Sequence, residues 1–177
     1  MFGFLSRRRR ADARKAEALY HQIVQQARRP EFYLAGGVPD TVAGRFDLIA
    51  LHAFLAMRQL KAAGQQGAGT AQALFDEMFA DMDRNLREMG VGDLGVGRRV
   101  KAMAKGFYGR VHAYEVALVA EAPGALTEAL GRNLYAGEAV DAARMATMAD
   151  YLRREAKAGE GRADVLEGRL LFGPPPV

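Results

Sequence analysis

Residues 74–118 read LFDEMFADMDRNLREMGVGDLGVGRRVKAMAKGFYGRVHAYEVAL and contain two helical patterns on either side of a glycine-rich turn. In the first pattern, apolar side chains recur at steps of three and four residues, which predicts an amphipathic helix with one face on a core. The turn Gly90-Val91-Gly92 ends that helix, because glycine adopts a positive φ at little cost. Asp93 is then the expected N-cap of the next helix. The apolar positions of the first pattern are Phe75, Met78, Phe79, Met82, Leu86 and Met89.

The second helix, expected at 97–121, has three different faces. One is apolar at alternating steps of four and three residues, and the last turns, 116–120, are apolar all round and expected to be buried. Another is basic, through Arg98, Lys101 and Lys105. The third consists of small residues, and each of its two glycines costs about 1 kcal/mol relative to alanine. Such glycines indicate the close approach of another helix, either of the same protein or of a partner. The small residues are Ala102, Gly106, Gly109, Ala113 and Ala117.

A family resemblance is carried by two motifs in this region, DMDRNLREMGVGDLGVG at 81–97 and FYGRxxAY at 107–114. They resemble the signature of the ubiquinol–cytochrome c chaperone family, and the similarity extends from about Tyr33 to Tyr135. Members of that family occur in mitochondria and alphaproteobacteria and assist the assembly of cytochrome b into ubiquinol–cytochrome c reductase. The resemblance therefore implies a non-enzymatic assembly chaperone whose partner is newly made cytochrome b. Mitochondrial members also work with a small partner protein and with the ribosome, so both are further candidate partners.

With this resemblance, the small-residue face becomes a candidate groove for a helix of the client. Charged and hydroxyl-bearing side chains beside it would contact polar segments of the client through ion pairs and hydrogen bonds at the rim. Composition and motif position select these residues, rather than roles carried over from the family. The candidate partner-binding residues are Arg87, Asp93, Arg98, Ala102, Gly106, Tyr108, Gly109, Arg110 and Ala113.

The composition is that of one ordinary globular domain, with 177 residues, 50% hydrophobic and 26% charged. The absence of cysteine excludes disulfides, thiolate metal sites and a cysteine nucleophile. The net charge of +4 comes from Arg7–Arg10, since 21 basic and 21 acidic residues remain without them. A protein that binds nucleic acid usually spreads its positive charge over a folded face. Specific nucleic-acid binding is therefore not expected.

The first eleven residues form a basic tail that we expect to be disordered. Its side chains also suit an anionic membrane surface, where each arginine adds about 1 kcal/mol. No stretch is long enough to cross a bilayer, since the most apolar one, Leu48–Met57, has ten residues. We therefore expect a cytoplasmic protein, with peripheral contact at the inner membrane as the alternative. The candidate membrane-surface residues are Phe2, Phe4, Leu5, Arg7, Arg8, Arg9 and Arg10.

The rest of the chain also reads as helices and connectors. The segment 45–63 is apolar all round and belongs at the centre of a bundle, and we interpret His52 within it as a buried, hydrogen-bonded histidine. Residues 64–69 are expected to be a flexible link, with Thr70 as the N-cap of the helix that follows. Further helices are expected at 11–29, 124–135 and 139–157.

These patterns predict an all-α fold, a single-domain bundle of six or seven helices without a sheet. The expected organisation is the tail at 1–11, a helical domain at 12–158 and a weakly ordered C-terminal tail at 159–177.

Motifs for metal binding and catalysis are incomplete. A calcium loop beginning at Asp81 would need glycine where Leu86 stands and glutamate where Gly92 stands. The three histidines lack the Glu-x-x-His pairs of a di-iron bundle, and the only serine, Ser6, lies in the tail. We therefore predict no catalytic residue, metal or cofactor. Two alternatives to a chaperone stay open: a ribosome- or nucleic-acid-binding helical protein that uses the basic tail and helix stripe, and an enzyme with a deep pocket.

Overall fold

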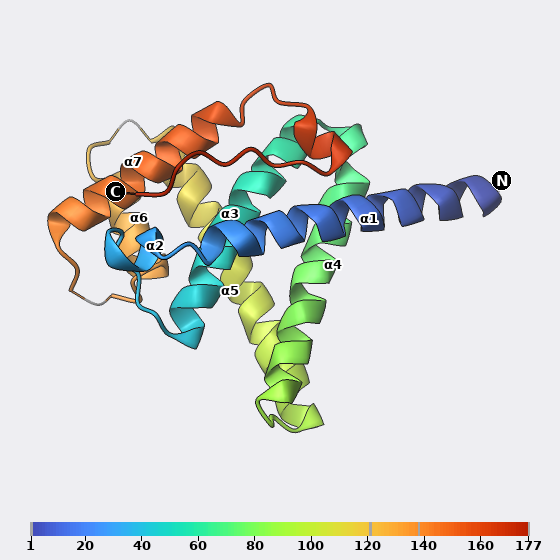
Figure 1. Cartoon of the computed structure of the whole chain (residues 1–177), viewed down its shortest axis with the longest axis horizontal. Coiled ribbons are helices and arrows are strands. Elements are labelled where there is room, and N and C mark those ends of the chain that lie inside the picture. The colour runs from blue at the N-terminus through green and yellow to red at the C-terminus, as the bar shows by residue number, and fades with distance from the viewer. Residues whose placement is uncertain (1, 121, 138, 177) are drawn as a thin grey trace.

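The computed structural model describes residues 2–120, 122–137 and 139–176, with side chains from Ser6 onward. Within these residues the chain is helical and contains no strand, which confirms the predicted all-α bundle (Figure 1). The elements are α1 (Phe2–Ala27), α2 (Glu31–Leu34), α3 (Val42–Ala62), α4 (Gln65–Glu88), α5 (Asp93–Val119), α6 (Ala125–Asn133), α7 (Ala142–Ala158) and the 3₁₀ helix η1 (Asp164–Glu167).

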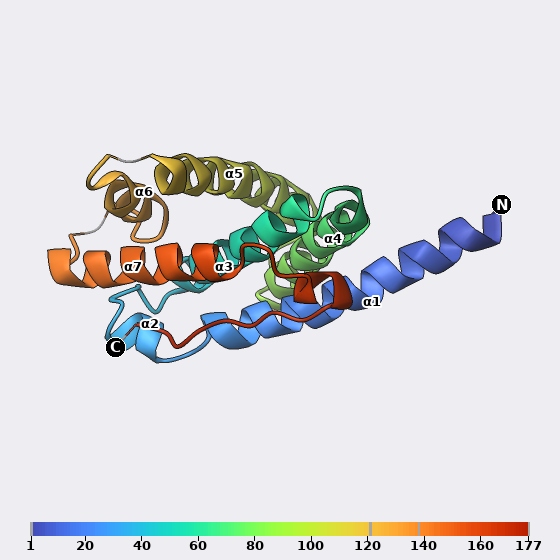
Figure 2. The same cartoon turned by 90° about the horizontal axis from the view of Figure 1, so that it is seen from above.

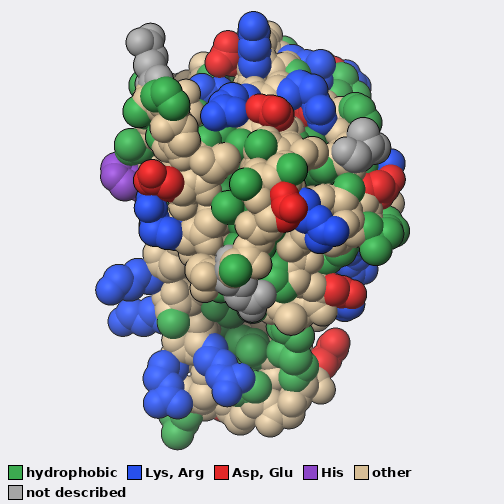
Figure 3. Space-filling view, turned by 90° about the vertical axis from the view of Figure 1, so that its left-hand side faces the viewer, with side chains coloured by type: hydrophobic (Ala, Val, Ile, Leu, Met, Phe, Trp, Pro, Cys, Tyr) green, Lys and Arg blue, Asp and Glu red, His purple; other side chains and the backbone are tan. Residues whose placement is uncertain are grey.

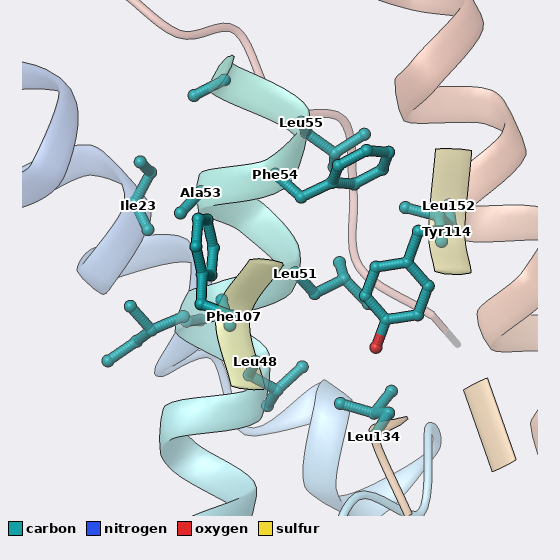
Figure 4. Close-up of a cluster of buried hydrophobic side chains, with 14 of the residues drawn as sticks. Ile23, Leu48, Leu51, Ala53, Phe54, Leu55, Phe107, Tyr114, Leu134 and Leu152 are labelled. Atoms are coloured by element: carbon teal, nitrogen blue, oxygen red, sulfur yellow. The ribbon is translucent and has the colours of Figure 1, made fainter. Parts of the chain in front are cut away.

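Helix α3 lies at the centre because its sequence is apolar on every side. From Phe46 to Ala56 every residue is buried, and α1, α4, α5, α7 and η1 all pack on it. Figure 4 shows side chains of α1, α5 and α7 meeting those of α3, and Figure 2 shows α5 and α1 on opposite sides of it. Phe54 of α3 and Tyr114 of α5 lie with ring centroids 5.6 Å apart.

The helices α4 and α5 form an antiparallel hairpin that extends beyond the body of the bundle (Figure 1). As predicted, Gly90 takes a positive φ of 81° and ends the first helix. Asp93 is the first residue of α5 rather than its side-chain cap, and Gly92 is the N-cap. The carboxylate of Asp93 instead accepts an ion-pair hydrogen bond from Arg87, whose guanidinium also binds Asp83 at 2.6 Å. This clasp joins the two ends of the turn.

The start of α4 differs from the sequence-based expectation. Residues 65–69 are helical rather than a flexible link, and Thr70 is a buried helical residue rather than an N-cap. Its hydroxyl donates to Asp12 Oδ1 of α1 at 3.0 Å. A Cβ at Gly67 would lie 2.1 Å from the carbonyl oxygen of Leu60, so glycine here permits the close crossing of α3 and α4. The glycines therefore serve packing, not flexibility.

Both ends of the chain also differ from the expected tails. Helix α1 already begins at Phe2, and Arg7–Arg10 are exposed along its first turns. The side chains of Phe2, Phe4 and Leu5 lie outside the described part of the structure. At the other end, Val165 and Leu170 are buried in the core, so residues 164–176 are part of the fold.

His52 is buried in α3, as predicted, and both of its ring nitrogens have partners. Nδ1 donates to the carbonyl oxygen of Leu48 at 2.7 Å, and Nε2 accepts from the Tyr151 hydroxyl of α7 at 2.8 Å. Burial disfavours the charged ring and lowers the pKa of His52 to about 4. The neutral ring therefore links α3 to α7.

Asp47 is a second polar group of α3, with an exposed fraction of 4%. Arg110 of α5 donates to its Oδ1 at 2.6 Å. Burial raises the pKa of Asp47 to about 6, although the Arg110 charge acts in the opposite direction. This ion pair fixes α5 against α3.

Replacing His52 with Gln should remove one acid-sensitive contribution to the free energy of unfolding. Because the pKa of His52 is lowered from 6.5 to about 4, its contribution is present above pH 6.5 and is lost as the pH falls through 4. The stability difference between parent and His52→Gln should thus shrink by about 3 kcal/mol from pH 7 to pH 4. Urea unfolding of both proteins measures it, and Asp47, whose pKa is raised, contributes equally to both. A pH-independent difference would contradict a neutral, buried His52.

Replacing Arg110 with Leu should lower the free energy of unfolding at pH 7 by about 3 kcal/mol, since it leaves a buried carboxylate unpaired. The double variant Asp47→Asn, Arg110→Leu should recover part of this loss. Arg98→Leu is the matched control, because Arg98 is exposed and a surface substitution changes stability by about 0.5 kcal/mol or less. Equal stability of Arg110→Leu and Arg98→Leu in denaturant titrations would show that the ion pair does not hold α5.

Candidate functional site

The small-residue face of α5 is uncovered over its first half. Ala102 and Gly109 are exposed, and Gly106 is partly exposed. A Cβ built at Gly109 would meet no neighbouring atom within 4 Å, and one at Gly106 would meet only the end of the Arg110 side chain, at 2.9 Å. None of the described helices crosses α5 here, so the glycines do not serve an internal helix crossing. We call Ala102, Gly106 and Gly109 the open face.

The same stripe is closed toward the C-terminal end of α5. Ala117 is buried and Ala113 is partly buried against the core. Helix α6 packs on this part of α5, and Arg110 Nε donates to the carbonyl oxygen of Asn133 at 3.3 Å. Ala113 therefore lies at the covered end of the candidate groove.

A basic stripe borders the open face. Arg98, Arg99, Lys101 and Lys105 are exposed on α5, and none of them forms an ion pair with any residue that the structure describes. Figure 3 shows Lys and Arg side chains gathered along one edge of the molecule. No described residue neutralises these charges, so they are available to an acidic partner.

Large apolar side chains are also exposed along α5. Leu94 is 95% exposed and Tyr108 60%, with the Tyr108 ring stacked on Phe75 of α4 at 5.3 Å. The expectation that 116–120 would be buried holds at Ala117 but is wrong at Val116 and Val119, which are 54% and 71% exposed. An apolar run predicts burial only if a neighbouring element covers it, and none of the described elements covers these two side chains.

The charged residues proposed for the rim have different surroundings. Arg98 stands in the basic stripe, whereas Arg87 and Asp93 bind each other at the hairpin tip. The carboxylates of Asp83 and Asp93 raise the pKa of Arg87. Arg110 points inward to Asp47, so its visible role is structural.

Sites for small molecules or metals are not supported by the described residues. No three histidine, aspartate or glutamate side chains among them gather as metal ligands. A cleft of about 520 Å³ lies between α1 and α4, but its Tyr20 donates to Asp81 at 2.7 Å and Arg84 binds the same carboxylate at 3.2 Å. These groups neutralise one another instead of converging on a substrate.

The length and apolar character of a helix decide whether it can span a membrane. None of those in the described ranges combines the length and the apolar character that a bilayer crossing requires.

Similar proteins are known. Ubiquinol-cytochrome-c reductase complex assembly factor 1 of Xenopus laevis is 21% identical over 159 residues, which cover 88% of this chain and 79% of that protein. The protein of the same name from Mus musculus is 23% identical over 137 residues, 77% of this chain. The aligned part spans only 46% of the mouse protein and 46% of the human one.

A solved structure and a family model also match this chain. The crystal structure of the Cbp3 homolog from Brucella abortus superimposes with a TM-score of 0.81 and 34% identity, covering 98% of this chain and 97% of that one. Residues 34–164 match the family model described as ubiquinol-cytochrome C chaperone. Because these relatives are chaperones and assembly factors, the prediction of a non-enzymatic protein is confirmed. The chain belongs to the ubiquinol–cytochrome c chaperone family, a family of assembly chaperones for ubiquinol–cytochrome c reductase.

Proposed function

We propose that this chaperone binds newly made cytochrome b through the open face of α5 and holds it before assembly of ubiquinol–cytochrome c reductase. The observation that carries the proposal is the uncovered small-residue face, at which a Cβ on Gly109 would have no neighbour within 4 Å. A helix with glycine in its interior is less stable than one with alanine. The presence of both Gly106 and Gly109 where no helix of the described chain covers them fits a surface that receives another backbone.

A membrane subunit supplies the type of helix that such a surface fits. Transmembrane helices associate through close van der Waals packing at small residues, and an unassembled one exposes apolar surface that needs cover. On this surface, Leu94, Tyr108 and Val116 supply apolar contacts around the open face. The interface would be shallow and tolerant of sequence, which suits temporary binding.

The basic stripe supplies the polar part of the proposed interface. Lys101 and Lys105 stand beside the open face without ion-pair partners in the described chain. Opposite charges at the edge of an interface raise the association rate and orient the partners. Acidic loop residues beside the apolar helix of the client would pair with these two lysines.

A ribosome- or nucleic-acid-binding function is the second candidate, and the same unpaired cations favour it. Binding to phosphates would depend on the cations alone, and its affinity would fall steeply with salt. Binding of an apolar helix depends mainly on the open face.

Peripheral contact with an anionic membrane is an accessory part of the proposal. The first turns of α1, with Arg7–Arg10, extend away from the bundle (Figures 1 and 2). Each arginine near anionic lipid adds about 1 kcal/mol, so this helix end would keep the chaperone close to the membrane where its client resides.

Gly109→Leu should reduce capture of cytochrome b from solubilised membranes at least tenfold, because the added side chain fills the open face. The fold should not suffer, since the site is open and leucine favours a helix over glycine. Gly97→Leu is the matched control: it is also open, and it lies about 120° around the same helix. Capture is measured by immunoblot on equal amounts of folded protein. Undiminished capture by Gly109→Leu would refute the open face as the binding surface.

A double charge variant separates the two candidate functions. Lys101→Gln with Lys105→Gln should weaken cytochrome b capture less than fivefold and leave it detectable at high salt. If the main ligand were ribosomal RNA, the same variant would lose most binding in ribosome sedimentation, with a smaller salt slope than the parent. Loss of cytochrome b capture to the level of Gly109→Leu would show that charge, not the open face, dominates.

A further inference from the structure

Residues 168–176, which we call the strap, run in an extended conformation between α1 and α7 (Figures 1 and 2). They follow η1 and contain no regular secondary structure. An extended segment held in a groove needs partners for its backbone groups, because buried N–H and C=O groups without hydrogen bonds are costly. The origin of those partners shows what kind of ligand the groove accepts.

Side chains of the helices bind the strap through its backbone. The side-chain amide of Gln22 donates to the carbonyl oxygen of Gly168 at 2.9 Å and accepts from the N–H of Leu170 at 2.8 Å. Gln26 donates to the carbonyl oxygen of Gly173 at 3.1 Å, and Glu155 accepts from the N–H of the same residue at 2.9 Å. Further donors are Arg162, to the carbonyl oxygen of Leu171, and Arg154, to that of Pro174.

This mode of binding combines core packing with features of peptide recognition. Hydrogen bonds to an extended main chain provide affinity without regard to sequence, and pockets for individual side chains provide specificity. Here Leu170 is buried, and the Phe172 ring meets the His52 ring edge to face at 5.1 Å. Leu171 between them is 57% exposed. Inward and outward side chains thus alternate, as in an extended ligand.

The groove also selects glycine at one position. A Cβ at Gly173 would lie 2.6 Å from Oε1 of Glu155. That carboxylate belongs to a residue only 5% exposed and is held in place by the Gly173 N–H and by Arg154 Nε at 3.1 Å. Together with the Phe172 contact, this makes an aromatic residue followed by glycine the sequence that fits.

The same carboxylate shows which backbone groups of an extended segment the groove pairs with. Without the strap, Glu155 would keep Arg154 but lose its N–H donor, and Gln26 would lose its acceptor at Gly173. Water would take the place of these partners, because the groove then opens to solvent. Another extended segment with an N–H and a C=O at this point would restore both hydrogen bonds.

We propose that the groove between α1 and α7 is a peptide-binding site, occupied in cis by the strap, and that its ligand in trans is an extended segment of a partner protein carrying an aromatic–glycine pair. The site is separate from the open face of α5 and does not depend on the proposed function. A tethered strap competes at an effective concentration on the order of millimolar. The groove therefore admits a partner segment only when that segment is abundant locally or when the strap is released.

The test uses the full chain with a protease site inserted between Glu160 and Gly161, cut after folding. A fluorescein-labelled peptide of residues 168–176 should exchange into the cut protein, seen as a rise in anisotropy that the unlabelled peptide reverses. It should bind the uncut protein at least a hundredfold more weakly, because the tethered strap competes. Equal affinity of the peptide for the cut and the uncut protein would show that it binds at a site other than the groove. Unfolding on cleavage, or no exchange, would show that the strap is a fixed part of the core.

Peptide variants test the proposed specificity. Gly173→Ala and Phe172→Ala peptides should compete at least tenfold more weakly than the parent peptide, because they lose the fit at Glu155 and at His52. The Leu171→Ala peptide is the matched control and should compete like the parent, since that side chain is exposed. If the Gly173→Ala peptide competes as well as the parent, the groove does not read glycine and the proposed ligand class is wrong.

Discussion

The burial of α3 on all sides is the constraint on which the rest of the structure depends. A helix that is apolar all round needs a complete shell of neighbours, and α1, α4, α5, α7 and η1 supply it. Each of these elements turns one side toward α3, and α5 leaves part of its other side exposed. The two polar residues inside α3 then fix the shell in place, because Asp47 needs Arg110 of α5 and His52 needs Tyr151 of α7. The central helix thereby determines which faces of the outer helices stay available for partners.

Much of this fold was predictable because its signals are local. The periodicity of α4 and α5, the glycine turn between them and the apolar character of α3 all act within a few residues of the chain. The errors arose where a distant residue decides. Gly67 resembles part of a flexible link until the carbonyl oxygen of Leu60 is seen 2.1 Å from its Cβ position. No helical or strand periodicity in the sequence of the strap predicts its position. That position depends on hydrogen bonds from side chains of α1 and α7 and from Arg162.

At the candidate site, too, local features were predictable from the sequence and contacts between distant residues were not. Helical spacing correctly placed Ala102, Gly106 and Gly109 on one face, but a sequence does not show whether another helix covers that face. Arg110 was predicted to stand at the rim because it lies in the same motif. Its partner Asp47 is 63 positions away and buried, so the guanidinium turns inward. Conversely, the exposure of Val116 and Val119 follows from the absence of a covering element among the described residues, which no local pattern encodes.

The two proposed binding surfaces differ in the shape of ligand that they accept. The open face of α5 suits a helix, whose own backbone groups are already satisfied and which needs only close apolar contact. The strap groove suits an extended segment, whose free N–H and C=O groups are what Gln22, Gln26 and Glu155 bind. In Figure 2 helix α5 and the strap lie on opposite sides of the bundle, with α3 between them. Ligands at the two surfaces therefore do not compete for space. One contact path between them runs through α3, where the Asp47 ion pair and the His52 hydrogen bonds lie about one and a half turns apart.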